Sequence, residues 1–423
     1  MRTPDPAALS AAYRRIRART MTLCEPLAPE DYRVQPMPDV SPPWWNIGHT
    51  SWFFARNVLH DFGDYTPDFA RFEFALNSYY EALGPRLARA RRGSVARPTT
   101  AEVLDYRSRV DDAMTTLLAR GGAEAWPEIA LRTVIGLEHE QQHQELLLSE
   151  VLAIRAHDPP ELRRPYCEPR ARTTAPAAPM RFVPVTGGLT VIGAEGDGFA
   201  WDNELPRHRA WVDDFAIADR LVTCGEWLEF IAAGGYRQPL LWLSNGWDEV
   251  QAQGLQAPLY WEERDGAWWQ WTLRGLQPVC PAAPVCHVSF YEADAFARWA
   301  GARLPTEREW ELAAQRFGFA PDAGNLLDDR LEDDALQTVP ARGDGVRQLA
   351  GDVWEWTTSH YEPYPGYRPF RDALSEYNGK FMDNQRVLRG GSFATPREHV
   401  RATYRNFWHA RTRFQFTGVR LAR

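Results

Sequence analysis

The sequence predicts an α+β protein of two domains, in which a bundle of helices is followed by a domain of short strands and long loops. The chain has 423 residues, more than a single hydrophobic core usually organises. Residues 1–157 carry apolar side chains at helical spacing, whereas residues 181–423 alternate short apolar runs with Gly, Pro, Asn and Asp. Between these parts, residues 158–180 hold many prolines among alanines and arginines, which predicts an extended linker.

Helical periodicity divides the first domain into predicted helices. They span residues 6–23, 45–59, 71–83, 100–120 and 126–156. Thr99 or Thr100 can cap the fourth of them, with Glu102 in its first turn. This pattern predicts an up-and-down bundle, in which facing helices commonly build metal sites. In the second domain, residues 289–300 and 306–315 are predicted to be helical, because each segment begins with Ser or Thr and carries Glu three positions later.

Composition and charge restrict the classes of function. The net charge is −8 and no long basic run occurs, so no nucleic-acid partner is expected. The sequence has no apolar run of about 18 residues and no signal-peptide core at residues 1–10, which predicts a cytoplasmic protein without a membrane partner. The five cysteines form an odd, scattered set and are interpreted as reduced thiols. We therefore expect small-molecule substrates for a monomer or small homo-oligomer.

A metal site is predicted in the last helix of the first domain. His139 and His143 are four residues apart in a run without Gly or Pro, so both project from one helix face, one turn apart. Catalytic metals commonly take three protein ligands, and His49, in an aromatic segment, is the candidate for the third. Neutral imidazole suits Fe, Zn, Cu or Ni, so the residues alone leave the metal open. The alternatives are a surface pair for the two spaced histidines and a core histidine at position 49.

Ordered motifs in both domains resemble the ergothioneine-biosynthesis sulfoxide synthases and the related selenoneine synthases. These motifs lie at residues 49–54, 77–86, 139–148, 202–208, 303–311, 351–357, 376–381 and 388–393. The resemblance implies a DinB-like four-helix bundle for the first domain. For the second it implies the fold of the formylglycine-generating enzyme, which is a C-type-lectin-like domain.

The resemblance also implies the chemistry. His49, His139 and His143 match the histidines that bind one non-heme Fe(II), and O2 is the co-substrate. The organic substrates are hercynine, the trimethylated betaine of histidine, and a selenium or sulfur donor. The product carries a new bond between the chalcogen and the imidazole carbon that lies between the two ring nitrogens.

Several site residues are implied near the metal by the same resemblance. Gln142 matches a glutamine that hydrogen-bonds the substrate imidazole. Tyr79 and Tyr80 lie where related enzymes place a catalytic tyrosine that delivers a proton or a hydrogen atom. Core packing is the alternative for the tyrosine pair.

Two further groups are implied to bind the substrates. Asn406 and Phe407 match the hercynine-contacting segment, and Trp408 is a further wall suited to a quaternary ammonium group. Arg86 and Arg89 match arginines that bind the carboxylates of a thiol donor. The alternatives are that the aromatic residues only close the core of the second domain and that the arginines form a solvated basic turn.

The chain departs from the usual pattern at residues 44–46, 55–56, 86–89 and 407–410. Trp44-Trp45-Asn46 stands where Lys-Trp-His is usual, and Leu87-Ala88 replaces His-Pro between the two arginines. An added tryptophan and lost polar groups suit a neutral sugar stacked on rings better than a zwitterionic peptide. We therefore favour a selenoneine synthase that uses a selenosugar. The alternative is a hercynine sulfoxide synthase that uses γ-glutamylcysteine or cysteine.

Other classes of protein share parts of this pattern. A zinc-dependent DinB-type thiol transferase would share the histidines but would not need the second domain. A formylglycine-generating enzyme would share the second domain, but residues 392–423 contain no cysteine for the pair that such enzymes use. A lectin-like binding protein gives no reason for histidines at metal-ligand spacing in the bundle.

Overall fold

The computed structural model describes residues 2–121, 124–170, 175–196, 198–328 and 336–423. Contacts divide the chain into two compact units. The first comprises residues 1–166 with Gly196–Phe199 and Arg371–Tyr377, and the second comprises Cys167–Glu195, Ala200–Phe370 and Asn378–Arg423.

The division falls inside the segment predicted as a linker. The Tyr166 hydroxyl donates to the carbonyl of Leu23 at 2.8 Å in the first unit. The backbone N–H of Cys167 donates to the carbonyl of Leu273 at 3.0 Å in the second unit. Residues 171–174 of the predicted linker lie outside the described residues. The predicted domain limits, 1–157 and 181–423, stay a prediction.

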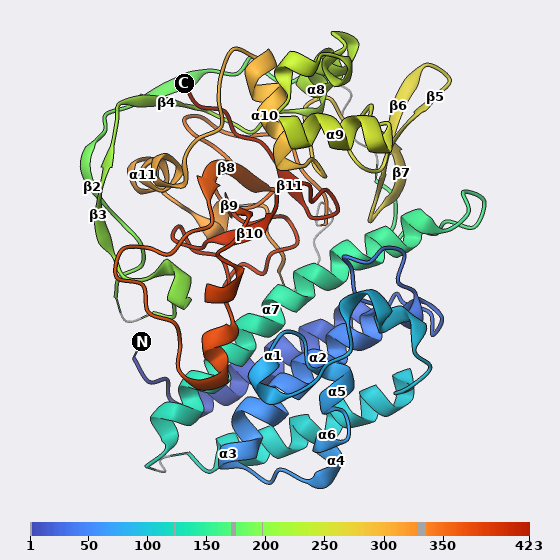
Figure 1. The fold of residues 1–423 in the computed structure, drawn as a ribbon, viewed down its shortest axis with the longest axis vertical. Coiled ribbons are helices and arrows are strands. Elements are labelled where there is room, and N and C mark those ends of the chain that lie inside the picture. Colours follow the sequence, from blue (N-terminus) through green and yellow to red (C-terminus); the bar gives the residue numbers. More distant parts are fainter. Residues whose placement is uncertain (1, 122–123, 171–174, 197, 329–335) are drawn as a thin grey trace. The chain divides into compact units, whose positions relative to one another are not determined.

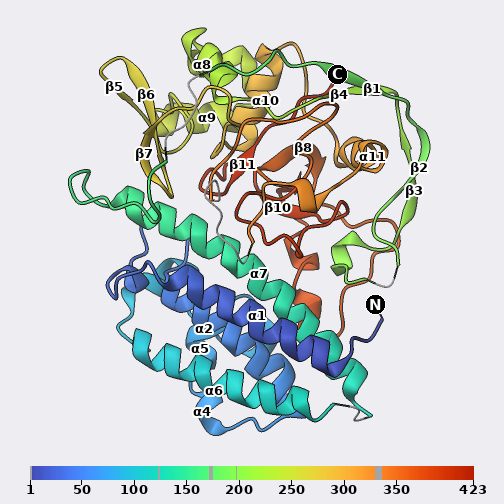
Figure 2. The same ribbon diagram turned by 180° about the vertical axis from the view of Figure 1, so that it is seen from behind.

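Four long helices form the bundle of the first unit. They are α1 (Pro6–Cys24), α2 (Pro43–Phe54), α6 (Thr100–Ala119) and α7 (Trp126–His157). Both α1 and α2 pack against both α6 and α7, so the four helices enclose one core (Figure 1, Figure 2). None of the helices in the described residues is long and apolar enough to span a membrane.

Local chemistry sets where the bundle helices begin and how closely they approach. Thr99 caps α6 through a capping box with Glu102, as its sequence predicts. The predicted second helix continues past Phe54 through a π-helical turn, Ala55–Leu59, into α3 (His60–Phe62). Gly136 allows α7 to lie against α2, because a Cβ atom there would be 2.4 Å from Cε1 of Phe54.

The prediction of one helix over residues 71–83 is wrong. Within this range the structure has only α5 (Glu73–Leu76) and the 3₁₀ turn Glu81–Leu83. The helix α4 (Pro67–Ala70) precedes the range, and the 3₁₀ turn Arg89–Ser94 follows it. Another 3₁₀ turn, Asp31–Arg33, lies between α1 and α2. The Asn77 side chain accepts from the Tyr80 N–H at 3.2 Å and donates to the Tyr80 carbonyl at 3.0 Å. An asparagine that binds nearby backbone in this way competes with helix formation and ends α5.

A buried carboxylate joins three helices of the bundle. Glu140 of α7 is fully buried and accepts hydrogen bonds from Arg17 of α1, Thr20 of α1 and Arg107 of α6, each at 2.7 Å. Burial alone would raise the pKa of Glu140, but the charges of Arg107 and Arg17 outweigh burial and hold the pKa at about 2. This contact fixes α7, which carries two of the three predicted metal ligands, His139 and His143.

Within its described residues, the second unit is built from four small sheets and several helices. Its strands are β1 (Phe182–Val185), β2 (Gly188–Ile192), β3 (His208–Val212), β4 (Phe215–Ala218), β5 (Trp261–Arg264), β6 (Ala267–Thr272), β7 (Gly275–Pro278), β8 (Trp354–His360), β9 (Gln385–Arg389), β10 (Asn406–His409) and β11 (Thr417–Gly418). The largest sheet has the order β10-β9-β8-β11, antiparallel except for the β8–β11 pair. The smaller sheets are β1-β4, β2-β3 and β5-β6-β7.

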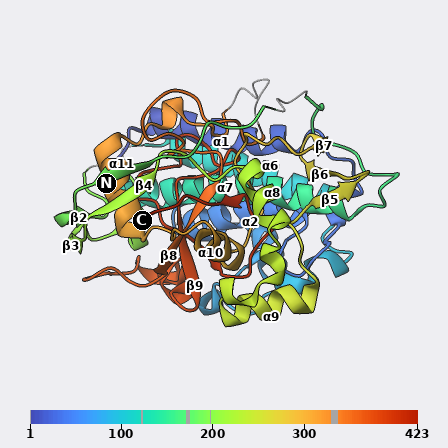
Figure 3. The same ribbon diagram turned by 90° about the horizontal axis from the view of Figure 1, so that it is seen from above.

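The helices of the second unit are α8 (Cys224–Ala232), α9 (Ser244–Gln253), α10 (Phe290–Trp299) and α11 (Glu307–Phe317). Figure 3 shows α8, α9 and α10 gathered on one side of this unit. Ser289 and Thr306 cap α10 and α11 through capping boxes, so both helices predicted here are present. The shorter 3₁₀ turns are Asp202–Glu204, Gly235–Arg237, Pro239–Leu241, Pro321–Ala323, Asp372–Glu376 and Gly379–Phe381, of which Asp372–Glu376 belongs to the first unit.

Buried ion pairs hold the core of the second unit. Glu355 of β8 accepts from Arg420 at 2.7 Å and from the indole N–H of Trp310 at 2.8 Å, and all three side chains are fully buried. A charge at this depth is stable only when it is paired in this way.

We expect Glu140→Ala to lower the free energy of unfolding of the bundle by about 3–5 kcal/mol, because two buried guanidinium groups lose their carboxylate. Chemical denaturation followed by helical circular dichroism measures the change. The matched control is Glu128→Ala on the same helix, whose exposed pair with Arg132 is worth about 0.5 kcal/mol. Because the folded-state pKa of Glu140 is lowered, its contribution is complete above the ordinary value of 4.5 and is lost as the pH falls toward 2. An equal effect of the two substitutions would contradict this role.

Candidate metal centre

The structure brings the three predicted metal ligands together inside the first unit. His49 lies in the middle of α2, and His139 and His143 lie one turn apart on α7. All three are buried, and each offers a ring nitrogen within 4.8 Å of the others. The ring centroids are 4.9 Å apart for His49 and His139, 5.0 Å for His49 and His143, and 4.6 Å for His139 and His143. The cluster is compact enough for one ion.

Hydrogen bonds orient two of the imidazoles. Nδ1 of His49 donates to the carbonyl of Leu76 at 2.6 Å, and Nδ1 of His143 lies 2.7 Å from Oδ1 of Asn46. Within the part of the chain that the structure describes, Nε2 of His49 and both ring nitrogens of His139 are buried without a hydrogen-bond partner. Unpaired polar atoms at this depth are costly, and one metal ion would bind Nε2 of His49 and one ring nitrogen of His139. The residues therefore fit a metal with imidazole ligands.

The environment keeps the imidazoles neutral. Burial lowers the pKa of His139 to about 3. Burial, reinforced by the neighbouring histidines, lowers the pKa of His49 and of His143 well below the ordinary value. A neutral imidazole has the lone pair that a metal ion needs.

Aromatic rings surround the cluster. Trp45 stacks on His49 with ring centroids 4.4 Å apart, and the guanidinium of Arg92 lies 3.3 Å from the centre of the same indole. Trp44 is fully buried and has the guanidinium of Arg33 at 4.6 Å. Trp44, the tryptophan added in this chain, and Trp45 thus both pack in the core of the bundle, where neither is exposed for stacking with a sugar.

A tyrosine that the sequence prediction did not single out lies beside the histidines. Tyr377 belongs to the segment Arg371–Tyr377 of the first unit, and its ring centroid is 5.6 Å from that of His139. Its hydroxyl donates to Oε1 of Gln142, the glutamine predicted to contact the substrate. The carboxylate of Glu376 accepts from the N–H groups of Glu81 and Ala82 at 3.1 and 3.0 Å, which anchors the segment. Tyr377 lies within a recognised motif, but no spacing rule connects it with a helix 235 residues earlier.

The predicted catalytic tyrosines lie one ring farther away. Tyr79 and Tyr80 stack on each other at 4.7 Å, and Tyr80 is fully buried, 5.7 Å from the ring of Trp52. Tyr79 approaches Tyr377 at 6.1 Å. The catalytic role of Tyr79 and Tyr80 stays a prediction, and Tyr377 is the phenol beside the candidate ligands.

The predicted donor-binding arginines lie at the surface of the first unit. Nε of Arg86 donates to Glu81 at 2.8 Å, and Arg89 reaches the carbonyl of Asp39 at 3.4 Å. Arg92, three residues on, is buried and donates to the hydroxyl of Ser41 at 2.8 Å. The sequence gives no signal that separates Arg92 from its exposed neighbours.

The predicted hercynine-binding residues lie on β10 of the second unit. Side chains alternate along a strand, so Asn406 and Trp408 face one side and Phe407 faces the other. Phe407 stacks on Tyr361 at 4.0 Å and lies 5.9 Å from Phe381. These residues therefore do not form one continuous wall, and their substrate contacts stay a prediction.

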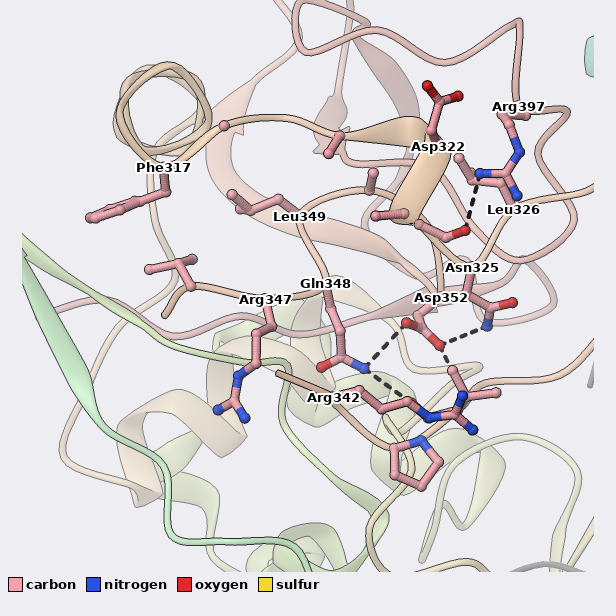
Figure 4. Close-up of a pocket in the computed structure, with 18 of the residues that line it drawn as sticks. Phe317, Asp322, Asn325, Leu326, Arg342, Arg347, Gln348, Leu349, Asp352 and Arg397 are labelled. Carbon is pink, nitrogen blue, oxygen red and sulfur yellow. Dashed lines mark hydrogen bonds between the residues drawn. The ribbon is translucent and has the colours of Figure 1, made fainter. Parts of the chain in front are cut away.

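A separate cavity of about 730 Å³ lies in the second unit (Figure 4). Its central carboxylate, Asp352, accepts from Asn325 and from the Val339 N–H at 2.8 Å and from Gln348 at 3.2 Å. Arg397, on its rim, is paired with Asp328 at 2.7 Å. Among the described residues, these polar groups of the cavity bind one another.

Comparison with known families defines the class of protein. Residues 12–147 match the family model described as the DinB superfamily, and residues 168–423 match the model of the sulfatase-modifying factor enzyme 1-like domain. The predicted fold class, a DinB-like helical domain followed by a domain of the formylglycine-generating-enzyme type, is confirmed.

Comparison with individual proteins narrows the class. A protein of Mycolicibacterium thermoresistibile named hercynine oxygenase is 34% identical over 99% of this chain and 95% of its own length. The hercynine oxygenase of Mycobacterium tuberculosis is 33% identical over 99% of both chains. That of Mycolicibacterium smegmatis is 37% identical over 69% of this chain and 71% of its own length. The chain belongs to the hercynine oxygenase family.

We expect His139→Ala to abolish metal binding while the helical circular dichroism stays unchanged, because the substitution removes one ligand and leaves the Glu140 network in place. Metal content after anaerobic loading and desalting measures the effect. The control is His60→Ala, which removes an exposed histidine from the same unit and should leave the metal content unchanged. Unchanged metal in His139→Ala would rule out the predicted site.

We expect the metal affinity to be nearly constant from about pH 8 down to about pH 5.5, because no proton has to be displaced from histidines whose pKa values are lowered. If the three histidines had the ordinary pKa of about 6.5, protonation of each would lower the metal affinity of the site about tenfold at the lower pH. Titration against a competing chelator distinguishes the two cases. A steep loss of affinity near pH 6 would contradict the neutral cluster.

Proposed function

We propose that this chain is a metal-dependent oxygenase that joins a sulfur donor to hercynine. The observation that carries the proposal is the buried histidine cluster, whose ring nitrogens lie within 4.8 Å of one another in a chain of the hercynine oxygenase family. In this proposal His49, His139 and His143 hold one Fe(II), and dioxygen is the co-substrate. The new bond forms at the imidazole carbon between the two ring nitrogens of hercynine.

The choice of iron follows from the chemistry that the reaction needs. Fe(II) bound by three imidazoles keeps open positions and supplies the redox chemistry that dioxygen activation requires. Zinc would fit the same histidines but has no redox chemistry. A zinc-dependent thiol transferase therefore remains the alternative from another class, and no contact within the described residues favours it.

Gln142 would orient the substrate, and Tyr377 would deliver a proton or a hydrogen atom. The Tyr377 hydroxyl donates to the carbonyl oxygen of Gln142, which directs the two N–H donors of this carboxamide away from the tyrosine. Such a donor suits a ring nitrogen of hercynine. The Tyr377 phenol lies beside His139 and is placed to deliver a proton or a hydrogen atom during the reaction.

The donor is proposed to be a thiol, γ-glutamylcysteine or cysteine. The relatives named hercynine oxygenase support this alternative over the selenosugar that the sequence departures favoured. Trp44 and Trp45 are also buried, so their rings are not exposed for stacking with a sugar. Arg86 and Arg89 lie at the surface, where guanidinium groups can pair with the carboxylates of such a thiol.

The test offers all donors to the Fe(II)-loaded protein in parallel. Hercynine and dioxygen are supplied with γ-glutamylcysteine, cysteine or a selenosugar, and mass spectrometry identifies the products. We expect a new carbon–sulfur bond with a thiol donor. Turnover only with the selenosugar would restore the selenoneine synthase assignment. Absence of hercynine turnover with every donor, or thiol transfer by the zinc form without dioxygen, would overturn the proposal.

We expect Tyr377→Phe to lower kcat by about a hundredfold or more, because the phenol supplies a proton in the reaction. Metal content should stay at the wild-type level, since the ring and its packing remain. Tyr79→Phe and Tyr80→Phe are the matched controls and should retain most of the activity. If a control loses activity while Tyr377→Phe does not, the assignment of the catalytic tyrosine is wrong.

A further inference from the structure

His143 is connected to a buried carboxylate through an asparagine side chain. Nδ1 of His143 lies 2.7 Å from Oδ1 of Asn46 on α2. The Asn46 side-chain nitrogen donates to Oε2 of Glu150, which lies on α7 two turns beyond the histidine. The other oxygen of Glu150 accepts from the backbone N–H of Ser41 at 2.8 Å. Asn46 and Glu150 are 2% and 3% exposed, so water cannot replace these contacts.

The donors and acceptors in this chain of contacts allow one arrangement. Above its pKa, Glu150 is a carboxylate that offers only acceptors, so Asn46 can then face it only with its NH2 group. The Asn46 carbonyl oxygen is then directed at His143, and this oxygen accepts only from an N–H group. His143 must therefore carry its proton on Nδ1, which leaves the lone pair of Nε2 for a metal ion.

We infer that Glu150, acting through Asn46, is a positioning residue that holds His143 in the metal-binding tautomer. The inference rests on the metal-dependent function proposed above and adds a residue that contacts neither metal nor substrate. It explains why a carboxylate is buried at this position, where an apolar side chain would avoid the cost of burying a charge. Arg92 donates to the Ser41 hydroxyl at 2.8 Å and places a positive charge near this carboxylate.

Glu150→Gln reverses the arrangement without changing the size of the side chain. Ser41 still requires an acceptor, so the oxygen of the new glutamine faces Ser41 and its NH2 group faces Asn46. Asn46 must then turn its oxygen toward the glutamine and its NH2 group toward His143. The histidine becomes the acceptor on Nδ1, and its proton moves to Nε2, where the metal would bind.

A second substitution should restore the original tautomer. In Asn46→Asp/Glu150→Gln, the new aspartate accepts from the NH2 group of the glutamine and from Nδ1–H of His143. The glutamine oxygen still accepts from Ser41. The double variant has the same total charge as the wild type, because the carboxylate has moved from position 150 to position 46. A residue that only filled space at position 150 would not be rescued by a change at position 46.

The experiment reads the tautomer and the metal affinity separately. The ¹⁵N shifts of the His143 ring in the metal-free full chain report which nitrogen carries the proton, and anaerobic Fe(II) titration against a chelator reports the affinity. Burial raises the pKa of Glu150 to about 8, so both measurements are made about one pH unit above that value, where the group is ionised. Glu128→Gln, an exposed change on the same helix, is the control.

We expect the proton of the His143 ring on Nδ1 in the wild type. In Glu150→Gln we expect it on Nε2, with an Fe(II) affinity that is 10- to 100-fold (about 1.4–2.7 kcal/mol) weaker. In the double variant we expect the wild-type tautomer and the wild-type affinity to return. The inference is overturned if the wild type carries the proton on Nε2. It is also overturned if Glu150→Gln keeps the wild-type tautomer and affinity, or if the double variant is no better than the single one. A wild type with the expected tautomer that binds no Fe(II) would count against the proposed function and leave the orienting role of Glu150 intact.

Discussion

The close contact between α2 and α7 is the constraint on which the candidate metal centre depends. His49 comes from α2, while His139 and His143 come from α7, so a small change in the separation of these helices would open the cluster. Gly136 permits the approach to Phe54, and the buried carboxylate of Glu140 fastens α7 to its other neighbours. The same packing removes water from the imidazoles and keeps them neutral. The packing of α2 against α7 therefore determines both the burial of the three histidines and their suitability as metal ligands.

The structure changes the meaning of the departures from the family pattern at residues 44–46. From the sequence alone, these departures indicate a change in the chalcogen donor. In the bundle, Trp44 and Trp45 are core residues, and Asn46 contacts the candidate ligand His143. The departure at Asn46 thus concerns how a ligand is oriented and leaves the donor to other parts of the chain. The burial of Trp44 and Trp45 therefore removes the reason for expecting a sugar stacked on these rings.

Local patterns predicted the capped helices and the common face of His139 and His143, because the causes of these features lie within a few residues. The capping boxes at Ser289 and Thr306 mark helices from their own side chains, and the spacing of His139 and His143 fixes their common face. Non-local features could not be predicted in this way. Tyr377 reaches Gln142 from 235 residues away, and only burial separates Arg92 from exposed arginines beside it. The prediction of a helix at residues 71–83 is wrong for a local reason, because the Asn77 side chain binds backbone groups that a helix would use.

We propose that one iron ion, held by the three histidines, lies where hercynine reacts. A crystal structure of the Fe(II)-loaded protein with hercynine, with data collected anaerobically on both sides of the iron absorption edge, would locate both. We expect a single anomalous peak bonded to ring nitrogens of His49, His139 and His143, with the imidazole of hercynine beside Gln142. Iron bound elsewhere, or hercynine bound away from this cluster, would contradict this proposal.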